Sequence, residues 1–138
     1  MQDRPVFLDS NVFIYAYSSS DPQKSDIARR VIGSGNIIVS SQVINEFVSV
    51  THRKLHHSIE SIETAVREFL QYIHVVPLTL ETSLLALRLA KEHQFSWYDC
   101  LIIAAARENN CSLIISEDLQ HGRVIEDALT IINPFRNE

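Results

Sequence analysis

The sequence predicts an α/β fold in which a short, mainly parallel sheet has helices on both faces. Short apolar runs alternate along the chain with longer segments whose apolar residues recur at a helical period. The short runs are apolar at nearly every position, which is typical of parallel strands buried on both faces. Since no long linker, low-complexity segment or internal repeat interrupts the 138 residues, we expect one domain spanning residues 1–138.

Each element is supported by its own pattern and by the residues that bound it. We expect strands over residues 6–8, 37–39, 75–77, 113–115 and 130–132. We expect helices over residues 12–17, 22–32, 40–55, 58–73, 79–92 and 96–108. Pro22 and Gly33 mark the two ends of the second helix. Thr79 and Ser96 stand at the expected N-caps of the last two helices.

Four acidic residues lie close to the junctions between these elements. Asp9 and Asp118 follow the first and fourth strands, and Glu46 lies early in the helix that begins directly after the second strand. The carboxyl ends of parallel strands meet at one edge of a sheet, where ligands bind in such folds, so we expect these three side chains there. Asp99 lies in the first turn of a helix that follows another helix, so the same argument does not place it.

Each acid also has a purely structural explanation. Asp9 can cap the helix after it, and Asp99 fits a capping box at the start of its own helix. Asp118 can be a turn residue next to its competitor Glu117, and Glu46, at the rim of an apolar stripe, can be a surface residue. Four carboxylates that met would repel one another, and a divalent cation offsets such repulsion. If the acids meet, a metal-dependent hydrolase is therefore the natural interpretation.

The composition excludes several classes of protein. A net charge of −5 argues against a protein that coats nucleic acid through Lys and Arg, but it does not exclude a nuclease. No apolar stretch reaches the roughly 18 residues of a membrane span, and the N-terminus does not fit a secretory signal. The cysteines, Cys100 and Cys111, lie in or beside apolar segments, which favours buried thiols in a reducing compartment and hence a cytoplasmic protein.

The four segments that carry the acids suggest a family when they are taken together. They are VFLDSNVFIYA, SSQVINEF, SWYDCLIIAAA and LIISEDLQHG, and in this order they resemble the acidic motifs of the PIN domain family, and within it the VapC-type toxins of toxin–antitoxin pairs. The resemblance extends from about residue 6 to Phe135. It implies a three-layer PIN-like fold and a metal-dependent endoribonuclease. The implied metal ligands are Asp9, Glu46, Asp99 and Asp118, and the implied polar supports are Asn11 and Ser116.

The resemblance also implies a cofactor and partners. Hard oxygen ligands suit Mg²⁺ or Mn²⁺ and neither zinc nor copper, while the number of ions stays open. RNA is the implied substrate, and the implied protein partners are a second copy in a homodimer and an antitoxin whose tail fills the acidic groove. The apolar faces of residues 58–73 and 79–92 are candidates for either protein contact, although core packing explains them equally well. The basic stretch 52–57 is either an RNA contact or a solvated helix end.

Three other functions are alternatives. A phosphatase of the haloacid-dehalogenase type also has an Asp after its first strand, but it needs a second acid two residues later, where this chain has Asn11. A housekeeping nuclease of RNA maturation would carry the same four acids. A non-catalytic metal- or RNA-binding module on the same fold would not need all of them.

Overall fold

The computed structural model describes residues 4–136 and contains a six-stranded sheet. The strands are β1 (Val6–Leu8), β2 (Ile37–Ser40), β3 (Ile73–Val76), β4 (Leu113–Ile115), β5 (Val124–Ile125) and β6 (Leu129–Ile132). Their order across the sheet is β3-β2-β1-β4-β6-β5, and every neighbouring pair is parallel except β5 and β6. The predicted α/β class and mainly parallel sheet are therefore confirmed.

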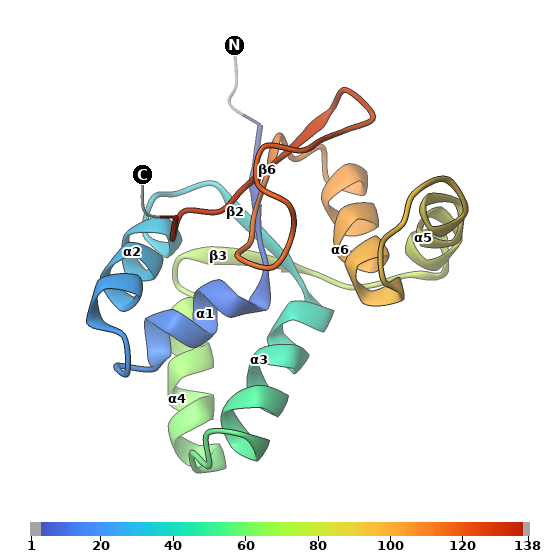
Figure 1. Cartoon of the computed structure of the whole chain (residues 1–138). Coiled ribbons are helices and arrows are strands. Elements are labelled where there is room, and N and C mark those ends of the chain that lie inside the picture. Colours follow the sequence, from blue (N-terminus) through green and yellow to red (C-terminus); the bar gives the residue numbers. More distant parts are fainter. Residues whose placement is uncertain (1–3, 137–138) are drawn as a thin grey trace.

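Six helices accompany the sheet within the described residues. They are α1 (Ser10–Tyr17), α2 (Pro22–Ile32), α3 (Ser41–Arg53), α4 (Ile59–Phe69), α5 (Leu80–Glu92) and α6 (Trp97–Glu108). Figure 1 shows α5 and α6 on one side of the sheet and α1, α2 and α4 on the other, which makes three layers. None of the helices in residues 4–136 has the length and apolar character needed to cross a membrane.

The core lies where the central strands meet α6. Phe7, Leu8, Ile114 and Ile131 of the sheet are completely buried, as parallel strands covered on both faces must be. Every residue of α6 from Cys100 to Ala106 is buried, in agreement with the apolar character of this helix on all sides. The two cysteines are free and buried, as predicted.

The helix starts predicted at Pro22 and Thr79 are confirmed. The Asp21 side chain accepts a hydrogen bond from the Lys24 amide at the start of α2, where Pro22 is the first helical residue. Thr79 and Thr82 satisfy each other's backbone amides at the start of α5. These local bonds, rather than tertiary packing, explain why the helix starts could be found in the sequence.

Two predicted helices end earlier than expected. The helix predicted over 58–73 ends at Phe69, because the chain turns there and Ile73 pairs with Ile37 in the sheet. The helix predicted over 40–55 ends at Arg53. In addition, β5 was not predicted, because it has two residues and its turn to β6 uses Glu126 and Asp127 at positive φ rather than the usual Asn and Gly.

Candidate metal centre

The topology brings the residues after β2, β1 and β4 to one edge of the sheet. β1 pairs in parallel with β2 on one side and with β4 on the other, and Leu8 lies opposite Ile115 in the register. The amide of Asp9 continues this pairing with a 3.0 Å hydrogen bond to the Ile115 carbonyl. The segments that carry Asp9, Glu46 and Asp118 therefore leave the sheet side by side.

Asp9 is almost completely buried and is held at both carboxylate oxygens. Its Oδ1 accepts a hydrogen bond of 2.7 Å from the Ser10 amide, so Asp9 is the N-cap of α1 as its structural explanation predicted. Its Oδ2 accepts a second bond of 2.7 Å from the Ser116 hydroxyl. The carboxylate is thus oriented before any ligand binds.

Ser116 and Asn11 connect the first and last acids. The buried Ser116 Oγ accepts hydrogen bonds from the amides of Asp118 at 3.1 Å and Leu119 at 3.3 Å while it donates to Asp9. The Asn11 side chain donates to Asp118 Oδ2 at 3.2 Å and accepts from the Glu117 amide at 3.3 Å. Both residues therefore lie where polar supports of the acids were expected.

Glu46 and Asp99 reach the same edge from α3 and α6. Glu46 is half-buried, and its Oε1 accepts a 2.9 Å hydrogen bond from Gln42 Nε2. The amide of Asp99 donates to the Ser96 hydroxyl at 3.2 Å, which is one half of the predicted capping box. The other half is absent, because no group in residues 4–136 donates a hydrogen bond to the Asp99 carboxylate. This carboxylate is accordingly not used by the helix cap.

The charges of Asp99 and Asp118 act on both Asp9 and Glu46. Burial raises the pKa of Asp9 above its ordinary value, and the charges of Asp118 and Asp99 raise it further. Burial also raises the pKa of Glu46, and here the charges of all three other carboxylates contribute. Hydrogen bonds to Asp9 and Glu46 oppose these effects without outweighing them. The structure thus places the four acids that the sequence had singled out near one edge of the sheet, but no three of them hold their carboxylate oxygens within 4.8 Å of one another.

Glu117 does not join this group. Its carboxylate accepts hydrogen bonds from the Tyr15 hydroxyl at 2.5 Å and from Lys24 Nζ at 2.6 Å. Burial raises the pKa of Glu117, but the bonds from Lys24 and Tyr15 outweigh it and the pKa lies below its ordinary value. Of the two neighbouring acids, Asp118 is therefore the one whose charge acts on the cluster.

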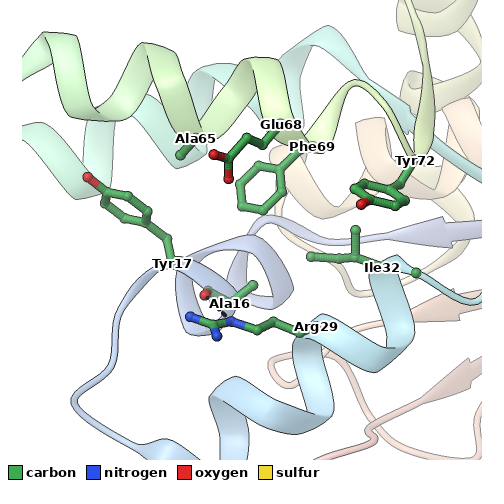
Figure 2. A pocket seen from close by; sticks show the side chains of 9 residues that line it. Ala16, Tyr17, Arg29, Ile32, Ala65, Glu68, Phe69 and Tyr72 are labelled. Carbon is green, nitrogen blue, oxygen red and sulfur yellow. Dashed lines mark hydrogen bonds between the residues drawn. The ribbon is translucent and has the colours of Figure 1, made fainter.

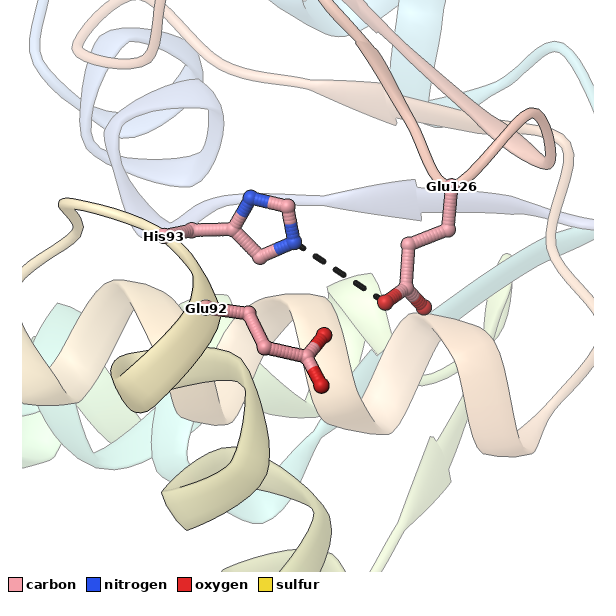
Figure 3. Close-up of side chains that lie close together, drawn as sticks. All are labelled: Glu92, His93 and Glu126. Atoms are coloured by element: carbon pink, nitrogen blue, oxygen red, sulfur yellow. Dashed lines mark ion pairs between the residues drawn. The ribbon is translucent and has the colours of Figure 1, made fainter.

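Within residues 4–136, the group of possible metal ligands that already lie close together does not include the four acids. Ligand atoms of Glu92, His93 and Glu126 lie within 4.8 Å of one another (Figure 3). However, Glu126 forms ion pairs with Arg88, at 2.9 Å, and with Arg107, and these guanidinium groups lower its pKa to about 2. A cation would have to compete with two fixed positive charges, so this group is an ion-pair network that fastens the β5–β6 turn to α5 and α6.

A pocket of about 530 Å³ lies between α1, α2 and α4. It is lined by Ala16, Tyr17, Arg29, Ile32, Gly33, Ala65, Glu68, Phe69 and Tyr72. Figure 2 shows the aromatic rings of Tyr17, Phe69 and Tyr72 around it, together with the guanidinium of Arg29 and the carboxylate of Glu68. None of the four acids lines this pocket, so it is separate from the acidic edge.

The donor set at the acidic edge fits a hard divalent cation. Four carboxylates provide the oxygen ligands that Mg²⁺ and Mn²⁺ prefer. Within the described part of the chain, two buried atoms at the start of α3, Ser40 Oγ and Gln42 Oε1, have no hydrogen-bond partner. Gln42 was missed in the sequence, although its position four residues before Glu46 on one helix was the signal that could have found it.

A comparison with family models supplies the remaining observation. The model described as PIN domain matches residues 6–126 of the sequence. This chain belongs to the PIN domain family. No curated protein matches the sequence of this chain significantly.

Solved structures with the same fold include toxins of toxin–antitoxin pairs. A toxin–antitoxin complex from Klebsiella pneumoniae matches with a TM-score of 0.71 and 17% identity, over 96% of this PIN domain and 99% of that chain. VapBC2 from Rickettsia felis, bound to a DNA fragment from its promoter, has a TM-score of 0.68 and 17% identity over 93% and 98%. VapC20 from Mycobacterium tuberculosis, described as a toxin that cleaves the sarcin–ricin loop, has a TM-score of 0.64 and 17% identity over 79% and 86%. These likenesses confirm the predicted PIN-like fold.

Proposed function

We propose that this PIN domain is a Mg²⁺- or Mn²⁺-dependent endoribonuclease that hydrolyses phosphodiester bonds of RNA. Asp9, Glu46, Asp99 and Asp118 would hold the metal. The observation that carries the proposal is that Asp9, Ser116 and Asp118 are joined by hydrogen bonds at one edge of the sheet, where the charges of Asp99 and Asp118 help to raise the pKa of both Asp9 and Glu46. Repulsion of this kind is unfavourable in the metal-free protein and is relieved by a bound cation.

The residues around the acids have complementary tasks in this mechanism. When bound, the cation would polarise the scissile phosphate and lower the pKa of a water molecule. Ser116 and the Ser10 amide keep Asp9 in one orientation, and Asn11 does the same for Asp118. The Asp99 carboxylate accepts no hydrogen bond from the described residues, so it can turn toward the metal without breaking one. RNA phosphates would approach this edge only after the cation has reversed its negative charge.

The biological role that we propose is the toxin of a toxin–antitoxin pair. Support comes from the solved structures with this fold, several of which are complexes of a toxin with its antitoxin. An antitoxin would silence the nuclease by placing a cationic side chain, such as Arg, against the carboxylates. We also propose a homodimer, because α5 leaves Leu80, Leu84 and Leu87 exposed at a spacing that makes one apolar stripe.

The metal proposal is tested by neutral replacements of single acids. Asp9→Asn and Asp99→Asn should each abolish cleavage of an RNA substrate in Mg²⁺ or Mn²⁺, while Asp127→Asn, an exposed acid in the β5–β6 turn, should cleave at the wild-type rate. Cleavage that survives both replacements at the wild-type rate would disprove the proposal. Growth arrest on expression, relieved by a protein encoded next to this chain, would separate a toxin from a housekeeping nuclease.

A further inference from the structure

Gln42 connects two elements of the acidic edge. It is the second residue of α3 and is buried, with 7% of its surface exposed. Its Nε2 donates a 2.9 Å hydrogen bond to Glu46 and lies 3.4 Å from the carbonyl oxygen of Tyr98, the residue before Asp99 in α6. One amide group thus holds Glu46 against the turn of α6 that carries the neighbouring acid.

The orientation of this amide follows from the chemistry of its neighbours. An ionised carboxylate and a backbone carbonyl only accept hydrogen bonds, so the nitrogen of Gln42 must be the atom that faces Glu46 and Tyr98. The oxygen, Oε1, is then buried, and no donor among residues 4–136 reaches it. An unpaired buried acceptor is costly, which indicates that the amide is kept in this place for the bonds of its nitrogen.

The contacts of Nε2 place Gln42 beside the proposed cation site. We infer that Gln42 is a positioning residue for a divalent cation at the acidic edge: its Nε2 holds Glu46 in place against the turn of α6 that carries Asp99. This inference rests on the proposed metal site, and it adds to it a residue that is not one of the four acids.

The test measures Mn²⁺ binding to the full chain without RNA, by paramagnetic resonance of free Mn²⁺. Gln42→Met keeps the length of the side chain and removes both polar atoms of the amide. We expect it to raise the Mn²⁺ dissociation constant at least about 10-fold, the usual loss when a partner of a metal ligand is removed. Gln23→Met is the matched control, because Gln23 is also the second residue of its helix and is exposed. It should bind Mn²⁺ like the wild type.

Melting temperatures separate positioning from a merely structural role. If Gln42 positions the cation, Gln42→Met reduces the rise in Tm that Mn²⁺ produces while the metal-free Tm stays near that of the wild type. An unchanged rise, or a dissociation constant within twofold of the wild type, overturns the inference. Gln42→Ala carries the same prediction if the Met variant does not fold. A different result would show that the proposed metal site itself is wrong: in that case Asp9→Asn would bind Mn²⁺ with the same dissociation constant as the wild type.

Discussion

Ser116→Ala is the change that tests the acidic edge most directly, because one buried hydroxyl there bonds to Asp9, to two backbone amides and, at 3.5 Å, to Asn11 Nδ2. The Ser116 Oγ donates to Asp9 and accepts from the amides of Asp118 and Leu119, and the side chain is completely buried. The variant leaves a buried carboxylate with one hydrogen bond fewer and two amides without their acceptor.

The cost can be worked out from these contacts. A hydrogen bond to a charged group contributes about 1.5–3 kcal/mol, and a buried amide without an acceptor costs about 1–3 kcal/mol. Water can reach the Asp118 amide, since Asp118 is exposed, so one amide at most pays the full penalty. We expect the free energy of unfolding at pH 7 to fall by about 3 kcal/mol and Tm to fall by about 10 °C.

The assay is urea unfolding of the metal-free protein, followed by circular dichroism. The matched control is Ser49→Ala, which removes an exposed hydroxyl on α3 and should change the unfolding free energy by less than about 0.5 kcal/mol. If Ser116→Ala lowered the free energy of unfolding by less than about 1 kcal/mol, the reasoning would be refuted, because the hydrogen bonds of this hydroxyl would then contribute little to stability. The slope of unfolding against urea should stay unchanged.

Three further predictions follow from the charges. Glu46→Gln keeps the bond from Gln42 and removes the repulsion between carboxylates, so the Tm of the metal-free variant at pH 7 should be higher than that of the wild type. This difference in Tm should disappear as the pH falls and Glu46 of the wild type takes up a proton. A lower Tm for the variant at pH 7 would contradict the prediction. The pKa of Glu126 is lowered to about 2, so its ionised carboxylate stabilises the fold at pH values above its unfolded pKa near 4.5. Glu126→Gln should therefore lower the free energy of unfolding in urea at pH 5, and this loss should shrink as the pH falls to 2. Glu117→Gln should retain RNA cleavage where Asp118→Asn loses it, and equal losses in a cleavage assay would contradict the assignment.

The sequence was informative where a local bond or a strict pattern decides the structure. The strands 6–8 and 113–115, the helix start at Pro22 and the cap at Thr79 were predicted, because apolar runs, proline and side-chain caps act over a few residues. The end of α4 was not predicted, since Ile73 fits a helical period as well as a strand, and only its pairing with β2 decides.

The residues of the candidate site were also predictable only in part from the sequence. Asp9 and Glu46 could be placed from their positions after strands, while Asp99 depended on the family resemblance. The choice between Asp118 and Glu117 could not be made in the sequence, because it is decided by Tyr15 and Lys24, which lie more than 90 residues away along the chain. Such long-range polar contacts leave no periodic pattern behind.

The bond between Ser116 and Asp9 joins residues 107 positions apart. During synthesis, the first acid therefore leaves the ribosome long before the hydroxyl that orients it and the last acid that accompanies it. A growing chain that stops before β4 has emerged cannot pair its first strand with β4 or assemble the acidic edge. If the protein cleaves RNA as we propose, the ribosome that makes it is exposed to an assembled acidic edge only after Ser116 and Asp118 have emerged.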